Sequence, residues 1–458
     1  MKISSINPAT GKPLREYTSY SREQVDAILE SAAQSAAGWA DVPVERRALL
    51  VAGAARILRE RHHDLAVLIT QEMGKPIQQS LAEIEKCAWV CDYYSQHGPA
   101  FLADEPVETG DQRSYVAYQP IGLVLAVMPW NFPFWQVFRF AAPALTAGNG
   151  IVLKHASSVC GCALAIERIF LEAGFPHNLF RSLLIPAGEV DHVIASPHVR
   201  AATLTGSEGA GRSVAACAGS HLKKTVLELG GSDPYLILED ADLDLAVEKC
   251  VTSRLNNGGQ TCIAAKRFIV VPAVREGFEA RLIRQMVARK LGDPMRGDTD
   301  IGPMAREDLR QEVHQQVTQS VKAGARLLVG GQLPDPTSPG FFYPATVLTG
   351  VRPGMPAYHE ETFGPVAAVL PAADEEEAIR IANDTRFGLG AAVFSRNIPH
   401  AEVVARRLQA GCVAINDFVK SDPRLPFGGV KASGYGRELA RHGLLEFLNI
   451  KSVSVATS

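Results

Sequence analysis

Alternation of short β-rich runs with helical patterns is the feature that most restricts how this chain can fold. Between residues 115 and 231, runs of β-branched and aliphatic residues are separated by segments whose apolar residues recur every three to four positions. A second series of the same kind extends from residue 267 to residue 416. Strands that alternate with helices predict parallel sheets covered by helices on both faces. We therefore predict an α/β fold with two parallel-sheet domains.

The segments outside these two series predict smaller elements. From Arg22 to about Gly98, long stretches repeat apolar residues at helical spacing, which indicates amphipathic helices that cover one face of a domain. The segment from Pro106 to Val116 and the tail from Leu445 have the pattern of strands without a partner nearby in the sequence. We expect these strands to pair with each other or with a neighbouring subunit.

Length and charge exclude several classes of protein. The 458 residues, of which 47% are hydrophobic, can bury a large core and are too many for one ordinary domain. The formal charge is −3, and no cluster of Lys and Arg could neutralise a row of phosphates, so we expect no nucleic-acid partner. Because no apolar run is long enough to span a bilayer, we expect no membrane partner and a cytoplasmic location.

Eight cysteines are present, and one of them stands in an unusual setting. Without an export signal, we expect reduced thiols, most of them filling space in the core. Cys160 and Cys162 lack a second Cys or His pair at ligand spacing, so we predict no metal. Cys262 lies in LNNGGQTCIAAK, where Gly258 and Gly259 could let a ligand approach the backbone. This setting favours a nucleophile over a buried structural thiol.

Two polar residues at strand ends are candidates for assisting this thiol. Glu228 ends an apolar strand before a double glycine, at the sheet edge where ligand clefts open in α/β proteins. No histidine is near Cys262 in the sequence, so a carboxylate could be the base, although an exposed surface glutamate would show the same pattern. Asn131 follows a strand and precedes a helical segment, where helix capping would explain it equally well.

Two further strand ends could contact phosphate or ribose. In LTGSEGAGR, Gly206 and Ser207 lie between a strand and a helix start, an arrangement that offers free backbone N–H groups to a phosphate. Neither of the common glycine-rich phosphate motifs occurs there, so an ordinary turn is the alternative. Lys154 closes the strand GIVLK, where an ammonium could hold ribose or phosphate oxygens.

Taken together, PWNFP, Lys154, LTGSEGAGR, LELGG, GGQTC, ETFGP and PFGGVKASGYGRE resemble the aldehyde dehydrogenase superfamily in order and spacing. The resemblance begins at INPATGK and covers nearly the whole chain. It implies a Rossmann-like cofactor-binding domain, a catalytic domain and a small β oligomerisation element, in a homodimer or a dimer of dimers. The implied ranges are 1–101 and 121–229 for the cofactor domain, 230–438 for the catalytic domain, and 102–120 and 439–458 for the oligomerisation strands.

The resemblance also implies catalytic roles. Cys262 would be the nucleophile, Glu228 the general base, and the Asn131 amide with the Cys262 backbone N–H the oxyanion hole. Addition of the thiolate to an aldehyde gives a thiohemiacetal, whose oxyanion helps to expel hydride onto a nicotinamide. The resulting thioester would be hydrolysed by a water that a carboxylate of raised pKa activates.

The cofactor implied by the resemblance is NAD or NADP. The residues assigned to cofactor binding by motif are Trp130, Lys154, Ser157, Gly206, Ser207, Gly211, Leu229, Glu361 and Phe363. Ser157 departs from the pattern of NAD-restricted members, which usually carry a glutamate three residues after the lysine. Loss of that carboxylate removes repulsion against a 2′-phosphate, so we expect both cofactors to be accepted.

The substrate is predicted from Arg139 and from the chain as a whole, which resembles the short bacterial NAD(P)-dependent succinate-semialdehyde dehydrogenases. Arg139 lies in an apolar run, where a guanidinium is costly unless it reaches a carboxylate or solvent. Its position matches one that binds the substrate's distal carboxylate in that subfamily, with a structural salt bridge as the alternative. A second arginine of the subfamily is replaced by Asn256. We predict oxidation of succinate semialdehyde, with Arg139 and Ser421 holding the carboxylate.

Four alternatives compete with this function. The chain could oxidise another small aldehyde, or it could be a CoA-acylating aldehyde dehydrogenase in which CoA takes the acyl group; Glu228 favours water over CoA. A cofactor-independent thiol hydrolase would use Cys262 alone, and the motifs at Asn131 and Lys154 argue against it. A non-enzymatic relative would be expected to have lost the cysteine, the glutamate or the asparagine, and all three are present.

Overall fold

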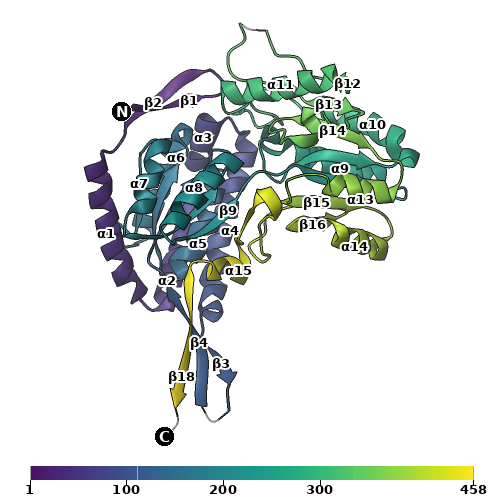
Figure 1. Cartoon of the computed structure of the whole chain (residues 1–458). Coiled ribbons are helices and arrows are strands. Elements are labelled where there is room, and N and C mark those ends of the chain that lie inside the picture. The colour runs from purple at the N-terminus through teal and green to yellow at the C-terminus, as the bar shows by residue number, and fades with distance from the viewer. Residues whose placement is uncertain (1, 111, 336, 457–458) are drawn as a thin grey trace.

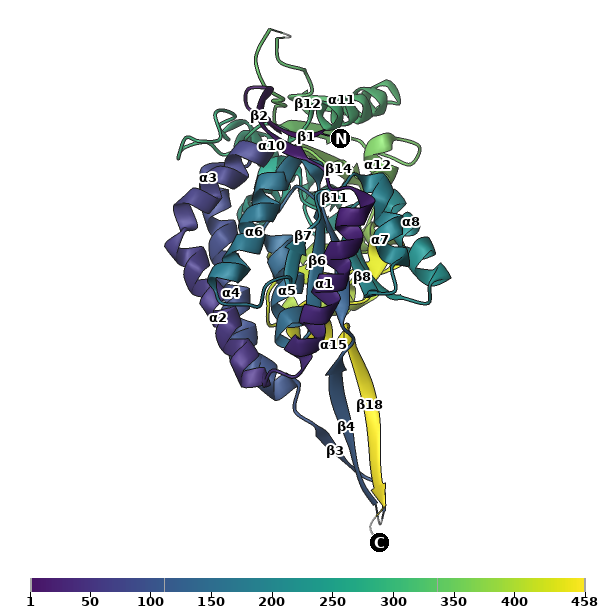
Figure 2. The same ribbon diagram turned by 90° about the vertical axis from the view of Figure 1, so that its left-hand side faces the viewer.

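The computed structural model describes residues 2–110, 112–335 and 337–456. Residues 1, 111, 336, 457 and 458, which the predicted domain ranges include, lie outside the described residues. The chain forms two lobes, each built on a sheet, and an arm that extends away from them (Figures 1 and 2). An N-terminal hairpin of β1 (Lys2–Asn7) and β2 (Lys12–Thr18) precedes the first helix.

The first lobe is built on a six-stranded sheet in the order β17-β9-β8-β5-β6-β7. All neighbouring strands are parallel except β17, which runs antiparallel to β9. The strands are β5 (Leu123–Met128), β6 (Gly150–His155), β7 (Phe180–Ser182), β8 (Val199–Thr205), β9 (Lys224–Glu228) and β17 (Gly434–Tyr435). Continuous apolar runs such as LVLAVM in β5 suit strands that are buried on both faces.

Helices cover both faces of this sheet. They are α1 (Arg22–Ala40), α2 (Val44–Glu60), α3 (His62–Met73), α4 (Ile77–Phe101), α5 (Trp135–Thr146), α6 (Cys160–Glu172), α7 (Val190–Ala195) and α8 (Glu208–Ser220). Residues of α2 to α6 form one large apolar core with β5 and β6, and α1, α7 and α8 contribute to a second. The amphipathic helices expected before Gly98 therefore pack as predicted.

The second lobe contains a seven-stranded sheet in the order β12-β13-β14-β11-β10-β15-β16. Its strands are β10 (Asp233–Ile237), β11 (Ala265–Val270), β12 (Arg326–Val329), β13 (Thr346–Thr349), β14 (Val366–Pro371), β15 (Gly390–Phe394) and β16 (Cys412–Ile415). Its helices are α9 (Leu243–Leu255), α10 (Pro272–Val287), α11 (Glu307–Lys322), α12 (Pro356–His359), α13 (Glu375–Asn383) and α14 (Ile398–Arg407). Only β12 runs antiparallel to its neighbour. The predicted α/β fold with two parallel-sheet domains is confirmed.

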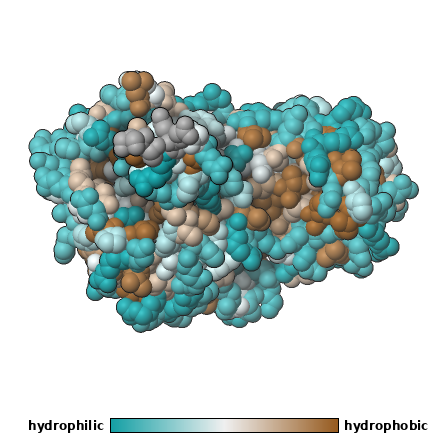
Figure 3. Space-filling view, turned by 90° about the horizontal axis from the view of Figure 1, so that it is seen from below, coloured by the Kyte–Doolittle hydropathy of each residue, from teal (hydrophilic) through white to brown (hydrophobic). Residues whose placement is uncertain are grey.

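The arm is a three-stranded antiparallel sheet in the order β18-β4-β3. Here β3 spans Glu105–Glu108, β4 spans Gln112–Pro120 and β18 spans Leu448–Ala456. The two strands that lacked a partner in the sequence therefore pair with each other. Viewed from the arm's side, the surface is mainly hydrophilic with separate hydrophobic patches (Figure 3). Val107, Ile450 and Val455 of the arm are exposed.

Details at the predicted boundaries differ from expectation. Residues 440–445, placed among the oligomerisation strands, form helix α15 (Ala440–Leu445), which packs against α4 and α5 through the buried Leu444. Strand β17, from the range assigned to the catalytic domain, joins the sheet of the first lobe. The run from Tyr115 to Pro129 divides into β4 and β5, because Gly122 adopts a positive φ of 116° between them.

Candidate active site

Cys262 follows a tight turn at the end of α9. Asn257, Gly258 and Gly259 all have positive φ angles, of 55°, 61° and 78°. A Cβ at position 259 would lie 2.2 Å from the carbonyl oxygen of Gly364, so only glycine fits there. The glycines were expected to leave room for a ligand. Instead, both glycines turn the chain, Gly259 packs closely against backbone, and neither lines the two cavities described below.

Lys266 of β11 holds this turn in place. Its Nζ donates hydrogen bonds to the carbonyl oxygens of Cys262 (2.6 Å) and Thr261 (3.1 Å) and forms an ion pair with Glu361 (3.1 Å). Glu361 also accepts a hydrogen bond from the backbone N–H of Gly231. The sequence analysis did not single out Lys266, because the sequence around a lysine in a strand does not indicate which carbonyl oxygens its side chain contacts in the fold. The lysine fixes both the cysteine and a predicted cofactor residue.

Two cavities meet at Cys262. The larger cavity, about 680 Å³ in volume, is lined by Cys262, by Asn131 and by six of the predicted cofactor residues. These six are Trp130, Gly206, Ser207, Leu229, Glu361 and Phe363. The smaller cavity, about 210 Å³ in volume, is lined by Cys262 together with Arg139, Ser421 and Asn256. Among the described residues, only Cys262 and Gln136 line both, so the thiol lies where the two spaces adjoin.

The start of helix α8 forms one wall of the larger cavity. Gly206 follows β8, and Ser207 caps the helix by accepting a hydrogen bond from the backbone N–H of Ala210. Free N–H groups and the helix dipole at such an end attract a phosphate. Gly211 does not line the cavity. A Cβ there would lie 2.6 Å from the side chain of Leu229, so Gly211 acts by letting α8 pack against that lining residue.

Of the predicted cofactor residues, Trp130 and Phe363 line the larger cavity, whereas Lys154 and Ser157 do not. Trp130 and Phe363 meet edge to face across the larger cavity, with ring centroids 5.9 Å apart. Lys154, at the end of β6, is buried, and its Nζ forms no hydrogen bond or ion pair within the described residues. Burial lowers the pKa of this lysine, and a ribose or phosphate oxygen would satisfy it. Ser157 is exposed nearby and places no carboxylate at that position.

The side chain of Asn131 is hydrogen-bonded to the turn that precedes Cys262 and does not cap a helix. Its side-chain N–H donates to the carbonyl oxygen of Gln260 (2.9 Å), and its Oδ1 accepts from Gln136 (3.1 Å). The first turn of α5 is capped by Glu83 instead, whose carboxylate accepts from the backbone N–H of Trp135 (3.0 Å). An amide nitrogen carries two N–H groups. One of them is therefore left for an oxyanion formed beside Cys262.

Glu228, the last residue of β9, is buried and lines neither of the two cavities. Its carboxyl lies against Gly428, where a Cβ would be 2.7 Å from Oε1, and neither oxygen has a hydrogen-bond partner in the part of the chain described. Burial and the neighbouring Glu438 raise the pKa of Glu228 well above its usual range, although Arg139 and Arg437 oppose this. The alternative of an exposed surface glutamate is therefore wrong.

The thiol itself is held in its protonated form. Burial raises the pKa of Cys262 to about 12, and the positive charges of Arg139 and Lys266 only partly offset this effect. The thiolate is the nucleophilic form of cysteine. At neutral pH, attack on a carbonyl therefore requires a base to remove the proton.

Arg139 reaches the smaller cavity but already has a carboxylate partner. Its guanidinium forms a buried ion pair with Glu438, donates to Thr205 Oγ1 (3.3 Å) and lies 4.8 Å from the ring centroid of Phe427. This arrangement is the structural salt bridge considered as the alternative. Glu438, which bridges Arg139 to the surroundings of Glu228, was missed in the sequence analysis.

Ser421 is hydrogen-bonded to Lys86, which is a second cation, besides Arg139, in the lining of the smaller cavity. Its Oγ accepts hydrogen bonds from Lys86 Nζ (2.8 Å) and from Trp135 Nε1 (3.1 Å). Lys86 lies on α4, more than 300 residues from Ser421 in the chain. A lysine within an amphipathic helix resembles any solvated surface residue, so the sequence offered no signal for it.

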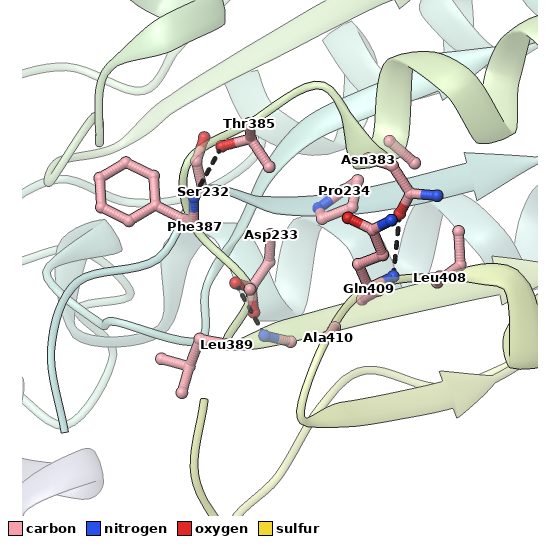
Figure 4. A pocket seen from close by; sticks show the side chains of 14 residues that line it. Ser232, Asp233, Pro234, Asn383, Thr385, Phe387, Leu389, Leu408, Gln409 and Ala410 are labelled. Atoms are coloured by element: carbon pink, nitrogen blue, oxygen red, sulfur yellow. Dashed lines mark hydrogen bonds between the residues drawn. The ribbon is translucent and has the colours of Figure 1, made fainter. Parts of the chain in front are cut away.

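A third cavity, shown in Figure 4, is structural. Its volume is about 10 Å³, enough for one water at most. Asp233 Oδ1 accepts a hydrogen bond from the backbone N–H of Gly390 (3.1 Å), and burial raises the pKa of Asp233 to about 7. None of the predicted site residues lines this cavity.

The eight cysteines are free, and no group of three or more His, Cys, Asp or Glu side chains among the described residues could hold a metal ion. No helix in the described ranges is long and apolar enough to cross a membrane.

The fold and the site define a class of α/β enzymes in which a cysteine separates a dinucleotide-sized cavity from a smaller one. The chain belongs to the aldehyde dehydrogenase family, whose sequence model matches residues 1–453.

Several relatives resemble this chain over its whole length. It is 50% identical over 456 residues to a probable succinate-semialdehyde dehydrogenase [NADP(+)] of Synechocystis sp., with 100% of both chains covered. It is 46% identical to a succinate semialdehyde dehydrogenase [NAD(P)+] of Escherichia coli, covering 98% of this chain and 97% of that one. A solved succinic semialdehyde dehydrogenase from Streptococcus pyogenes in complex with NADP+ matches with a TM-score of 0.97 and 38% identity, covering 99% and 100% of the two chains.

Proposed function

We propose that the protein oxidises succinate semialdehyde to succinate, with NADP or NAD as the cofactor, through a thioester on Cys262 that water hydrolyses. The observation that carries this proposal is the position of Cys262, which lines both cavities. A carbonyl in the smaller cavity and a nicotinamide in the larger one would both reach the same sulfur. The names of the relatives similar over the full length support this substrate and these cofactors.

In the first step, Glu228 would take the proton of the Cys262 thiol and release it to solvent. The sulfur forms a bond to the carbonyl carbon, and the carbonyl oxygen becomes an oxyanion. The free N–H of the Asn131 amide and the backbone N–H of Cys262 would donate to that oxyanion. Each donor contributes on the order of 3 kcal/mol in a site shielded from water. Because Gln260 and Gln136 fix the Asn131 side chain, the donor is in place before the charge develops.

The residues that would hold the cofactor are Gly206 and Ser207 at the start of α8, Lys154 and Glu361. When bound, the nicotinamide supplies the hydride acceptor that turns the thiohemiacetal into a thioester. Ser157 leaves space and no negative charge beside a 2′-phosphate, which supports the use of NADP.

In the last step, Glu228 would take a proton from water while the water oxygen bonds to the acyl carbon. The bond from carbon to sulfur then breaks, Glu228 returns the proton to the sulfur, and the thiol of Cys262 is restored. A carboxyl whose pKa is raised is suited to this work near neutral pH. Because its carboxyl lies against Gly428 in the structure, Glu228 must rotate toward Cys262 to act. Its presence favours water over CoA as the acceptor.

We also propose that the arm joins subunits into a homodimer or a dimer of dimers. The exposed Val107, Ile450 and Val455 on its strands support this role. In this proposal, the predicted division into a cofactor domain, a catalytic domain and oligomerisation strands applies, with α15 and β17 as the exceptions described above.

The experiment that tests the proposed function compares two four-carbon aldehydes, succinate semialdehyde and butanal, with NADP+ and with NAD+, in the absence of CoA. We expect kcat/KM to favour succinate semialdehyde by about a hundredfold, roughly 3 kcal/mol, and one succinate to form per reduced cofactor. Equal use of butanal would contradict the substrate. A requirement for CoA would favour the acylating alternative, and a preference for NAD+ above about a thousandfold would contradict the role of NADP.

A further inference from the structure

A single ammonium group contacts both peptide groups that flank the nucleophile. Lys266 Nζ donates hydrogen bonds to the carbonyl oxygens of Thr261 (3.1 Å) and Cys262 (2.6 Å), and it pairs with the carboxylate of Glu361 (3.1 Å). An ammonium has three N–H groups, so these three contacts use all of them. The lysine is buried. Lys266 is therefore fixed against the turn that carries the thiol.

The peptide group between Thr261 and Cys262 is held at its oxygen. Besides Lys266, the backbone N–H of Ala264 donates to the Thr261 carbonyl oxygen (3.1 Å), so both lone pairs of that oxygen are used. The peptide is trans and planar, and its N–H, which belongs to Cys262, points opposite to the carbonyl. The contacts that fix the oxygen therefore also fix the direction of the Cys262 N–H.

The Cys262 N–H is left for a ligand. Within the described residues it donates to no backbone or side-chain acceptor, and Cys262 lines both cavities. A positive charge at the oxygen end of an amide polarises the amide, and hydrogen bonds linked in such a chain strengthen one another. The ammonium on the far side of the peptide thus makes this N–H a stronger donor.

We propose that Lys266 is a positioning residue of the oxyanion hole. It holds the peptide between Thr261 and Cys262 so that the Cys262 N–H points at the oxyanion that forms when the thiolate adds to a carbonyl. This inference rests on the proposed function, which supplies the carbonyl addition. It complements the Asn131 amide, the other donor, whose side chain is fixed by hydrogen bonds of its own.

A second effect of Lys266 must be separated from this one. Its positive charge partly offsets the rise in the pKa of Cys262 that burial causes. Two reactions of the same sulfur, both without cofactor, separate the effects. Iodoacetamide loses iodide from a saturated carbon, and no oxyanion forms. With p-nitrophenyl acetate, the thiolate adds to a carbonyl, an oxyanion forms, and p-nitrophenolate leaves as the thioester is made. Both rates are proportional to the thiolate fraction, so their ratio reports on the oxyanion.

The test measures both second-order rate constants for wild type and for Lys266→Met, which keeps a side chain of similar length and removes the charge and the donors. We expect the ratio of acylation to alkylation to fall about thirtyfold, which is part of the hundred- to thousandfold that one oxyanion donor contributes. In aldehyde oxidation with NADP+, kcat should fall by a similar factor for succinate semialdehyde and for butanal, with each KM within about threefold of wild type.

Lys223→Met is the matched control. Lys223 also donates to two backbone carbonyl oxygens, those of Ile194 and Ser196, and it lines neither cavity. We expect its ratio of acylation to alkylation to stay within about threefold of wild type. Thermal unfolding of each variant verifies that the fold is retained. If Lys266→Met does not fold, Lys266→Gln, which keeps an amide N–H without the charge, takes its place with the same expected direction.

A ratio within about threefold of wild type in the folded Lys266 variant would overturn the inference. This holds also where both rates fall together, because Lys266 would then act on the ionisation of the thiol alone. If wild type forms no acetyl adduct on Cys262, or if Cys262→Ala releases p-nitrophenolate as fast as wild type, the proposed nucleophile is wrong and the proposed function is overturned with it.

Discussion

The larger and the smaller cavity meet at one sulfur atom but are built in different ways. Four of the six predicted cofactor residues that line the larger one come shortly after strands: Trp130 after β5, Gly206 and Ser207 after β8, and Leu229 after β9. The smaller one is lined by side chains from α4, α5 and the segment 418–427, which are far apart in the sequence. The cofactor side thus depends on local turns, whereas the substrate side depends on tertiary contacts. Substrate choice can therefore change while cofactor binding is preserved.

A substitution at Asn131, beside Cys262, is expected to have the largest effect on the reaction rate. Asn131→Ala removes a donor to the oxyanion, and we expect kcat to fall about a hundred- to a thousandfold for every aldehyde. The variant also loses hydrogen bonds to Gln260 and Gln136, so its melting temperature must be measured beside its rate. A folded variant with kcat within tenfold of wild type would contradict an oxyanion role.

Arg139 tests the substrate side. Arg139→Met leaves Glu438 buried without a partner, so we expect the free energy of unfolding to fall by about 3 kcal/mol or more. The ratio of kcat/KM for succinate semialdehyde and butanal should fall about thirtyfold, because Arg139 lines the smaller cavity and was predicted to hold the substrate carboxylate.

The double variant Arg139→Met with Glu438→Gln is the control, and chemical denaturation is the measurement. It should recover part of the lost stability, because the unpaired carboxylate is removed with its partner. A substrate ratio that changes less than about threefold in Arg139→Met would contradict the prediction from the sequence that Arg139 holds the substrate carboxylate.

The same contrast explains which parts of the structure the sequence predicted. Strand and helix alternation predicted both sheets, because buried parallel strands require continuous apolar runs. The edge strands β12 and β17 were not predicted as antiparallel, since the pairing of short edge strands leaves little trace in composition. Helix α15 lies in the range 439–458 that the resemblance assigned to oligomerisation strands, and six residues are too few to show a helical period.

The candidate site shows the same difference between residues found from local motifs and residues that depend on distant partners. Cys262, Asn131 and the residues at the start of α8 were found from local motifs and lie together as expected. Lys86 and Glu438 were not found, because their significance depends on partners that are distant in the chain. For Arg139, an apolar setting correctly indicated that a partner was needed, but it could not indicate which carboxylate would serve.

Ser157 tests the cofactor side alone. Ser157→Glu restores a carboxylate near the expected 2′-phosphate, and we expect kcat/KM for NADP+ to fall about ten- to thirtyfold by charge repulsion, with a smaller change for NAD+. Initial rates with both cofactors provide the measurement. The preference between succinate semialdehyde and butanal should not move, since Ser157 does not line the smaller cavity. An equal loss with both cofactors would contradict the assignment.

The pH dependence of thiol alkylation tests the protonation state of Cys262, which lies where the two cavities adjoin. Since the pKa of Cys262 is about 12 in the free protein, the thiolate fraction rises with pH throughout the accessible range. We expect the rate of iodoacetamide modification to increase about tenfold per pH unit from pH 7 to 9 without a plateau. Peptide mass spectrometry separates Cys262 from the other cysteines. A plateau near pH 8 would show a thiol whose pKa is far lower.

The central claim is that Cys262, placed between the two cavities, carries the acyl group during turnover. Its most direct test uses Glu228→Gln, in which hydrolysis should be slowed, mixed with NADP+ and succinate semialdehyde and quenched in acid. We predict a succinyl adduct of about 100 Da on the peptide that contains Cys262, in proportion to the reduced cofactor formed in the first turnover. Formation of reduced cofactor with no adduct on Cys262, or its undiminished formation by Cys262→Ala, would contradict the account.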